Sequence, residues 1–208
     1  MRAKGIKSCC FLMLATQFFL LCGCRERVLS PNAYIKYMTD SKHNATRQKN
    51  MNKLKYTVRY MTPEMMVLRE LRHFSQVDGK LFDSLKNEYD GLCYFDMRVE
   101  PLEDGGHIYN ALDKTKKEVA NAEWYMSFDM GRDFMLVSGS DTVGSALYHF
   151  NSTTGLSKVY DYSLAFNRKK GSEQEDMVLV YEDKIFGDGL LKFYFSAAEI
   201  QSLPKLKL

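Results

Sequence analysis

The fold is decided by residues 53–74, which read KLKYTVRYMTPEMMVLRELRHF. In the first eight of these residues, apolar or aromatic side chains alternate with polar ones. This period of two predicts a strand that is buried on one face. Thr62, Pro63 and Glu64 then provide an N-cap, a proline at the first helical position and an acid in the first turn. We therefore expect an amphipathic helix directly after the strand, and its apolar face comprises Val67, Leu68, Leu71 and Phe74.

A second helix and a second strand follow. Asp78 is placed to cap this helix, and Gly91 is placed to end it in a left-handed conformation. Residues 92–99 then alternate again, with Cys93 on the apolar face. This pattern predicts another half-buried strand. Because a free cysteine among apolar neighbours behaves as a small hydrophobic residue, we expect Cys93 to be buried and unreactive.

The same patterns predict the remaining elements. Helices are expected over 31–39 (capped by Ser30), over 114–125, and between a capping box at Ser196 and Glu199 and the terminating Pro204. Strands are expected at 134–138, 146–150, 159–166, 177–181 and 190–195, and a loop over 40–52.

The order of these elements predicts an α+β fold, with short helices packed on a mostly antiparallel sheet. A C-terminal β-meander is the simplest way to connect the later strands. No internal repeat, low-complexity segment or linker interrupts the chain, so we expect one domain over residues 31–208. The composition, 45% hydrophobic and 26% charged over 208 residues, is typical of a globular protein and excludes collagen-like and wholly disordered chains.

The first 23 residues have the composition of a signal peptide. Arg2, Lys4 and Lys7 form a cationic start without any acid, and an apolar run of about 15 residues follows over 9–23. This run is shorter than the roughly 20 residues that a helix needs to cross a bilayer. A cleaved leader is therefore the first interpretation.

The end of the leader, Leu21-Cys22-Gly23-Cys24, resembles the lipobox of bacterial lipoproteins. The resemblance implies that Cys24 receives a diacylglyceryl group, that the chain is cut before it, and that its new amino group is acylated, for example by palmitate. An ordinary secretory leader with an unmodified Cys24, or an uncleaved anchor helix, remains an alternative. Residues 24–30 would be a short tether of at most about 20 Å, which would hold the domain close to the membrane.

Cleavage would change the charge and the cysteine count. The leader carries three of the 29 Lys and Arg residues and none of the 26 Asp and Glu residues, so the mature chain would be neutral. A neutral chain gives no general attraction for nucleic acid, and none is expected as a partner. Cys93 would be the one free thiol left, which excludes a disulfide framework.

No motif with a fixed catalytic mechanism occurs. The sequence lacks phosphate-binding, dinucleotide-binding, zinc-protease and serine-hydrolase motifs, and no two of its four histidines have metal-ligand spacing. No cofactor or metal is therefore expected. His107, His149 and Asp141 are candidates for an enzyme or small-ligand site that forms only in three dimensions. We expect residues 137–141 to form a turn rather than a nucleophile.

Aromatic residues are unusually frequent, with 13 Tyr and 13 Phe. Trp124 and Tyr125 are the first place where we expect a contact patch. The segments around Tyr34, 147–150 and 162–166 are similar to an uncharacterised group of lipoproteins from Bacteroidota-type bacteria, which implies a Gram-negative envelope but no activity.

Two functions are consistent with these features. The first is a non-enzymatic lipoprotein that is anchored in the outer membrane, faces the periplasm and binds a protein partner of unknown identity. The second is an envelope enzyme or a small-ligand receptor, whose activity would require the candidate polar residues to meet in one pocket.

Overall fold

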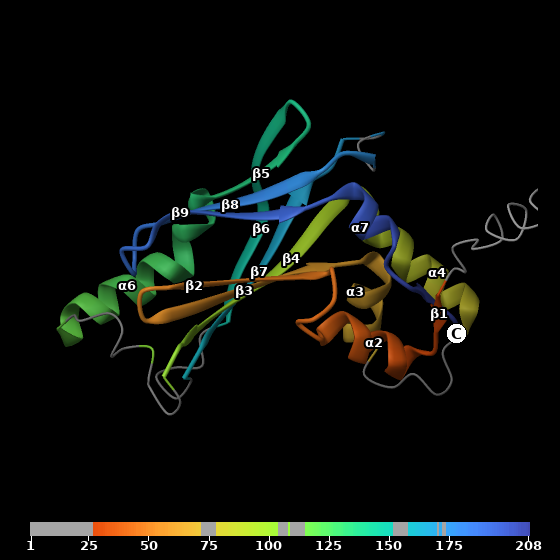
Figure 1. The fold of residues 1–208 in the computed structure, drawn as a ribbon, viewed down its shortest axis with the longest axis horizontal. Coiled ribbons are helices and arrows are strands. Elements are labelled where there is room, and N and C mark those ends of the chain that lie inside the picture. The colour runs from red at the N-terminus through yellow and green to blue at the C-terminus, as the bar shows by residue number, and fades with distance from the viewer. Residues whose placement is uncertain are drawn as a thin grey trace, which may run out of the picture.

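The computed structural model describes residues 27–71, 78–103, 108, 115–151, 158–169, 171 and 174–208. Within these ranges the chain forms an eight-stranded antiparallel sheet with the order β2-β3-β4-β7-β6-β5-β8-β9 (Figure 1). The strands are β2 Thr46–Met51, β3 Leu54–Met61, β4 Leu92–Pro101, β5 Phe134–Ser138, β6 Asp141–Asn151, β7 Tyr160–Asn167, β8 Met177–Asp183 and β9 Gly189–Phe195. The fold class is α+β, as predicted.

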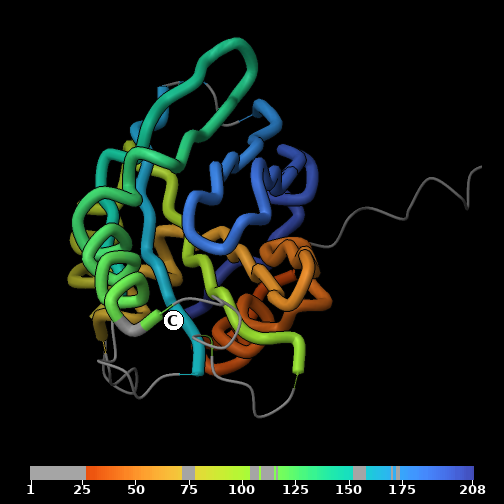
Figure 2. Tube along the Cα trace, turned by 90° about the vertical axis from the view of Figure 1, so that its left-hand side faces the viewer, coloured from red at the N-terminus to blue at the C-terminus, as the bar shows by residue number. Residues whose placement is uncertain are grey.

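The sheet curls until it is nearly a barrel, which brings its two edge strands together. Seen along the long axis, the N-terminal strands in orange lie beside the C-terminal strands in blue (Figure 2). Side chains join the edges in place of a backbone ladder. Arg47 of β2 donates from Nε to the carbonyl oxygen of Tyr194 in β9 at 2.6 Å, and Asn52, just after β2, donates to Asp188, just before β9.

The helices form two groups. Helices α2 Pro31–Thr39, α3 Pro63–Glu70 and α4 Gly79–Glu88 lie together at one end of the long axis, and α6 Lys116–Phe128 lies at the other (Figure 1). The short helices η2 Met130–Asp133 and α7 Ala197–Gln201 complete the set. A small parallel pair, β1 Val28–Leu29 with β10 Lys205–Leu206, lies beside α2 and ties the start of the described chain to its end.

Two apolar cores hold these layers together. The inner face of the curled sheet is filled with aromatic rings, among them Phe134 and Tyr181, whose centroids lie 4.7 Å apart. The outer face of β3, β4 and β7 contributes Met61, Tyr94 and Ala165 to a second core beneath α2, α3 and α4. The alternating strand patterns in the sequence predict the buried inner face correctly. They do not predict the second core, because they assign Tyr94 to the polar face, where the structure buries it beneath the helices.

Three sequence-based expectations need correction. The predicted loop over 40–52 contains strand β2, because an edge strand whose inward residues are Arg47 and Lys49 shows no apolar alternation. A meander would place β8 beside β7, whereas β8 pairs with β5. Only the connections β5-β6-β7 and β8-β9 join sequence neighbours in this half of the sheet.

The third correction concerns the tether. Val28 and Leu29, which the sequence assigns to the segment before the domain, pair with Lys205 and Leu206. The folded part therefore begins closer to Cys24 than expected. The leader, Cys24 itself, Phe74 and His107 lie outside the described residues.

Candidate functional site

The outer face of the sheet carries rows of polar side chains that the helices leave uncovered. Antiparallel register aligns Thr57, Arg98, Asp161 and Asn151 across β3, β4, β7 and β6. Two residues further along each strand, on the side of the helices, the same strands align a second row: Arg59, Asp96, Ser163 and His149. Because alternate residues of a strand face the same side, both rows point away from the aromatic interior.

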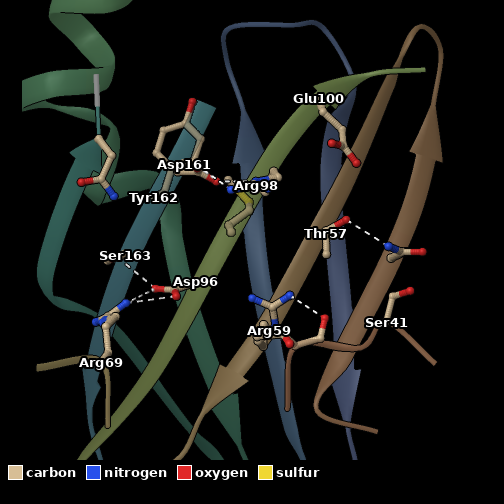
Figure 3. Close-up of a pocket in the computed structure, with 14 residues that line it drawn as sticks. Ser41, Thr57, Arg59, Arg69, Asp96, Arg98, Glu100, Asp161, Tyr162 and Ser163 are labelled. Carbon is tan, nitrogen blue, oxygen red and sulfur yellow. Dashed lines mark hydrogen bonds and ion pairs between the residues drawn. The ribbon is translucent and has the colours of Figure 1, made fainter. Parts of the chain in front are cut away.

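These rows form the floor of a polar groove of about 400 Å³ (Figure 3). Arg69 at the end of α3 and the segment just after α2 provide its walls on the side of the helices. The groove is lined by Thr39, Ser41, Gln48, Thr57, Arg59, Arg69, Asp96, Met97, Arg98, Glu100, Asn151, Asp161, Tyr162 and Ser163.

Most of the charges in the groove are paired with each other. Arg69 donates from Nη1 to both carboxylate oxygens of Asp96 at 3.1 Å, and the Ser163 hydroxyl donates to Asp96 at 3.0 Å. Arg98 forms a two-pronged pair with Asp161, at 2.7 Å from Nε and 2.9 Å from Nη2. At the edge, Lys55 pairs with Glu100 at 2.6 Å. Paired arginines hold carboxylates in fixed orientations and give the groove a defined shape.

Arg59 is different. Its guanidinium donates from Nη2 to the Thr39 carbonyl oxygen at 3.1 Å, and its buried Nε has no hydrogen-bond partner in the part of the chain that the structure describes. Among the described residues, no carboxylate forms an ion pair with it within 4 Å. Burial lowers the pKa of Arg59, an effect that Asp96 opposes and Arg98 reinforces. Arg59 is thus a partly desolvated cation without a direct anionic partner.

An apolar groove of about 300 Å³ adjoins the polar one. The two share Arg69, Asp96 and Ser163, so they form one continuous trough across β4 and β7. Its apolar lining comprises Met66, Tyr94, Phe95, Leu147, Tyr148, Leu164 and Ala165. The side chain of Leu147 is 60% exposed, which is high for a leucine on a sheet.

The trough has the chemistry of a binding surface. Its polar half offers fixed donors and acceptors, and its apolar half offers a place to bury a hydrophobic group. Within the described ranges, no group of three His, Cys, Asp or Glu residues is arranged to hold a metal ion.

The candidate catalytic residues from the sequence do not converge on this trough. His149 lies on the outer face of β6 and lines the apolar groove. Asp141 begins the same strand eight residues earlier, about 26 Å away at the rise of a strand, and pairs with Lys169 at 3.1 Å. His107 is outside the described residues. His149 and Asp141 therefore cannot act on one substrate atom.

The other expectations for single residues can be placed as well. Cys93 is buried, and burial raises the pKa of its thiol to about 12, which agrees with an unreactive role. The predicted turn at 137–141 is the hairpin between β5 and β6, with Gly139 at a φ of +55°. Trp124 is 59% exposed and its ring lies 5.5 Å from that of Phe128, whereas the Tyr125 hydroxyl donates to Asp133.

Sequence reasoning missed the polar groove. Arg59, Asp96 and Arg98 occupy the alternate positions of segments that predict strands, and such positions are usually only solvated. A signal was present, because Arg59 and Asp96, on the outer faces of two predicted strands, carry opposite charges. The pairing of β3 with β4 and of β4 with β7 is what joins these residues into a site.

Comparison with known proteins gives no match to a family model, to a curated protein or to a solved structure. Across the described ranges, no helix combines the length and the apolar character that crossing a bilayer requires.

Proposed function

We propose that this chain is a non-enzymatic lipoprotein of a bacterial envelope, and that it binds a segment of a partner protein in the trough on the outer face of its sheet. The observation that carries the proposal is the contiguity of the polar and apolar grooves on a surface that α2, α3 and α4 leave open. An extended segment with alternating side chains matches such a surface, since it can present polar groups to one groove and an apolar group to the other.

The membrane anchor is part of this proposal. The lipobox assigns the lipid to Cys24, and strand β1 begins at Val28. A fully extended link between them spans about 14 Å, so the end of the domain with β1, α2 and β10 would lie against the bilayer. Arg27, Lys205 and Lys207 are exposed at this end and suit anionic headgroups. We place the protein on the periplasmic side of the outer membrane.

This placement predicts that the exposed aromatic pair Trp124 and Phe128 points away from the membrane. Helix α6, with Trp124 and Phe128, lies at the end of the long axis opposite β1 (Figure 1). An anchor at Cys24 would therefore hold the pair away from the lipid, where it would be free to contact protein rather than headgroups.

The charges of the groove favour binding over catalysis. Asp96 and Asp161 each accept two hydrogen bonds from an arginine, and Asp96 accepts a third from Ser163. Carboxylates held in this way orient a ligand, whereas a general base needs to be free to take up a proton.

The test uses the full-length protein expressed in an envelope of the same type. A photo-crosslinking amino acid is placed at Gln48, which lines the polar groove, and at Leu147, which lines the apolar one. The control position is Lys192, which faces outward on β9 away from both grooves. We expect the same partner protein to be captured from both groove positions and not from Lys192. Equal capture from all three positions, or no reproducible product, would overturn the proposal.

Intact mass tests the anchor separately. The purified protein should lack residues 1–23 and carry acyl groups at its new N-terminus. A chain that retains the leader, or an unmodified Cys24, would contradict the anchor without affecting the groove.

A small-ligand receptor is the second candidate, and the volume of the polar groove favours it, because about 400 Å³ falls within the usual range of small-molecule sites. Native mass spectrometry distinguishes the two functions. A receptor would release a bound small molecule of constant mass, whereas a protein-binding module would not.

A further inference from the structure

We propose that Arg59 is the anion-recognition residue of the trough, and that it binds a carboxylate of a peptide whose apolar side chain enters the adjoining groove. This inference rests on the proposed function and names the chemistry of the segment that the trough accepts. It follows from the charge balance of the polar groove, from the environment of Arg59 and from the spacing between the two grooves.

The charge balance singles out Arg59. Every other cation at the groove is matched by a carboxylate in the pairs Arg69 with Asp96, Arg98 with Asp161 and Lys55 with Glu100. Arg59 has no such pair among the described residues. Among the described residues, the groove therefore carries one uncompensated positive charge, on Arg59, beside Asp96 and Thr57 (Figure 3).

The environment of Arg59 makes this charge unfavourable in the free protein. A guanidinium has five N–H donors, and within the described ranges that of Arg59 uses one of them, on the carbonyl of Thr39. Its Nε is sealed from water without a partner. Burying a charged group without a partner of opposite charge is costly. An anion that reaches the groove-facing end of the guanidinium therefore provides the negative charge that the protein itself does not. Planar carboxylates fit the fork of an arginine better than other anions of one charge.

The neighbours of Arg59 select an anion of one charge. Asp96 lies close enough to affect the pKa of Arg59, and Glu100 lines the same groove. A phosphate group with nearly two negative charges would be repelled by these carboxylates. The neutral groups Ser41, Gln48 and Thr57 offer hydrogen bonds to the atoms next to a carboxylate.

The spacing of the trough favours a peptide over an acidic sugar. Arg59 lies on β3 and Ala165 lies on β7, two strands away, which corresponds to about 10 Å across the sheet. An extended peptide covers this distance in about three residues. It can therefore place a carboxylate on Arg59 and an apolar side chain between Met66 and Leu147. An unsubstituted sugar ring carries hydroxyl groups and has no apolar side chain to fill the apolar groove.

The carboxylate could be an acidic side chain or the C-terminus of a chain, and matched probes separate these sources. The first pair is the acetylated and amidated peptides DSSL and NSSL, which differ only in the charge of the first side chain. The second pair is acetylated LSSA with a free carboxylate and with an amide. Binding is measured by calorimetry with the full-length protein in detergent, for the wild type and for Arg59→Gln, Arg59→Lys and the control Lys192→Gln.

We expect at least one charged peptide to bind at least tenfold more tightly than its uncharged counterpart. Arg59→Gln should remove this difference and Arg59→Lys should retain part of it. Lys192→Gln removes a cation that faces outward on β9 and lines neither groove, so it should change the difference less than about threefold. Arg59→Gln should unfold at the same temperature as the wild type or at a higher one, because it removes an unpaired charge.

Equal binding of charged and uncharged peptides, unchanged binding by Arg59→Gln, or no binding of either charged peptide at about 10 mM would overturn the inference. The proposed function would survive each of these results if the crosslinks from Gln48 and Leu147 still capture one partner. Failure of the crosslinks, with charged peptides still bound through Arg59, would instead favour a receptor for small carboxylates.

Discussion

Arg47 shows how much of this fold depends on one side chain. It is the first inward-facing residue of β2, and its guanidinium donates to the carbonyl oxygens of Tyr194, Asn44 and Thr46. It also forms an ion pair with Glu199 at 2.5 Å, the residue that completes the capping box of α7. Its guanidinium carbon lies 4.9 Å from the centre of the Phe195 ring. One residue thus joins the two edges of the sheet and the last helix.

We expect Arg47→Ala to lower the free energy of unfolding by about 2 kcal/mol, because it leaves partly buried acceptors without a donor. The matched control is Arg98→Ala, which removes an arginine whose side chain is 52% exposed, against 23% for Arg47. That change should cost less than about 1 kcal/mol. Chemical denaturation measures both values. If the two variants lose the same stability, Arg47 does not close the sheet in the way described.

Single residues also mark where prediction from sequence ends. The alternation over 53–60 correctly places Tyr56 inside and Arg59 outside. It gives no partner for either, because partners come from strands that are distant in the chain. Asp188, which accepts a hydrogen bond from the Tyr56 hydroxyl, is 132 residues away.

At the scale of secondary-structure elements, the helix N-caps show the same limit of prediction from sequence. Ser30 and Thr62 both precede a proline at the first helical position, and the sequence predicts both as N-caps. In the structure, the Thr62 hydroxyl accepts a hydrogen bond from the Met65 amide at 3.2 Å and shares another with the Tyr34 hydroxyl at 2.7 Å. Ser30 occupies the cap position of α2 without a side-chain hydrogen bond. Only the packing of α2 against α3 distinguishes the two.

We expect Thr62→Ala to lower the free energy of unfolding by about 2 to 3 kcal/mol, since it removes a cap and leaves the buried Tyr34 hydroxyl without its partner. Ser30→Ala should change it by less than about 0.5 kcal/mol. Thr62→Ser should retain most of the stability because it keeps the hydroxyl. Thermal and chemical denaturation of the three variants provide the comparison. Equal losses for Thr62→Ala and Ser30→Ala would contradict the link between α2 and α3.

How clearly the sequence predicts a strand depends on whether the strand lies in the centre or at the edge of the sheet. Central strands such as β4 and β7 bury one full face, and their alternation is clear in the sequence. The edge strand β2 fills its inward positions with Arg47 and Lys49, whose side chains lie against the rings of Phe195 and Phe193. Such a strand has no apolar period to detect. The pairing of β8 with β5 was equally hidden, because a local pattern does not specify which strand a later one joins.

At the scale of the molecule, the two faces of the curled sheet have different roles. Its inner face is filled by aromatic side chains and gives stability, while its outer face carries the second core under the helices and, next to it, the open trough. This separation is possible because successive residues of a strand point to opposite faces of the sheet. The residue types on the inner face can therefore differ from those on the outer face.

The aromatic interior leads to a prediction for the whole molecule at alkaline pH. Burial, the main cause, raises the pKa of many tyrosines, including Tyr34, Tyr56, Tyr162 and Tyr181, and raises those of Tyr89 and Tyr125 to about 12. Unfolded tyrosines lose their protons near pH 10, so the unfolded state binds fewer protons than the folded state above that pH. The stability that these groups contribute is fully present below pH 10 and decreases as the pH rises towards 12 and beyond. We expect the tyrosinate absorbance of the buried rings, which are the majority, to appear together with the loss of near-ultraviolet circular dichroism in one cooperative transition. If most of the tyrosinate absorbance forms gradually from pH 10 while the circular dichroism stays constant, the buried rings are accessible to solvent and do not form the core described here.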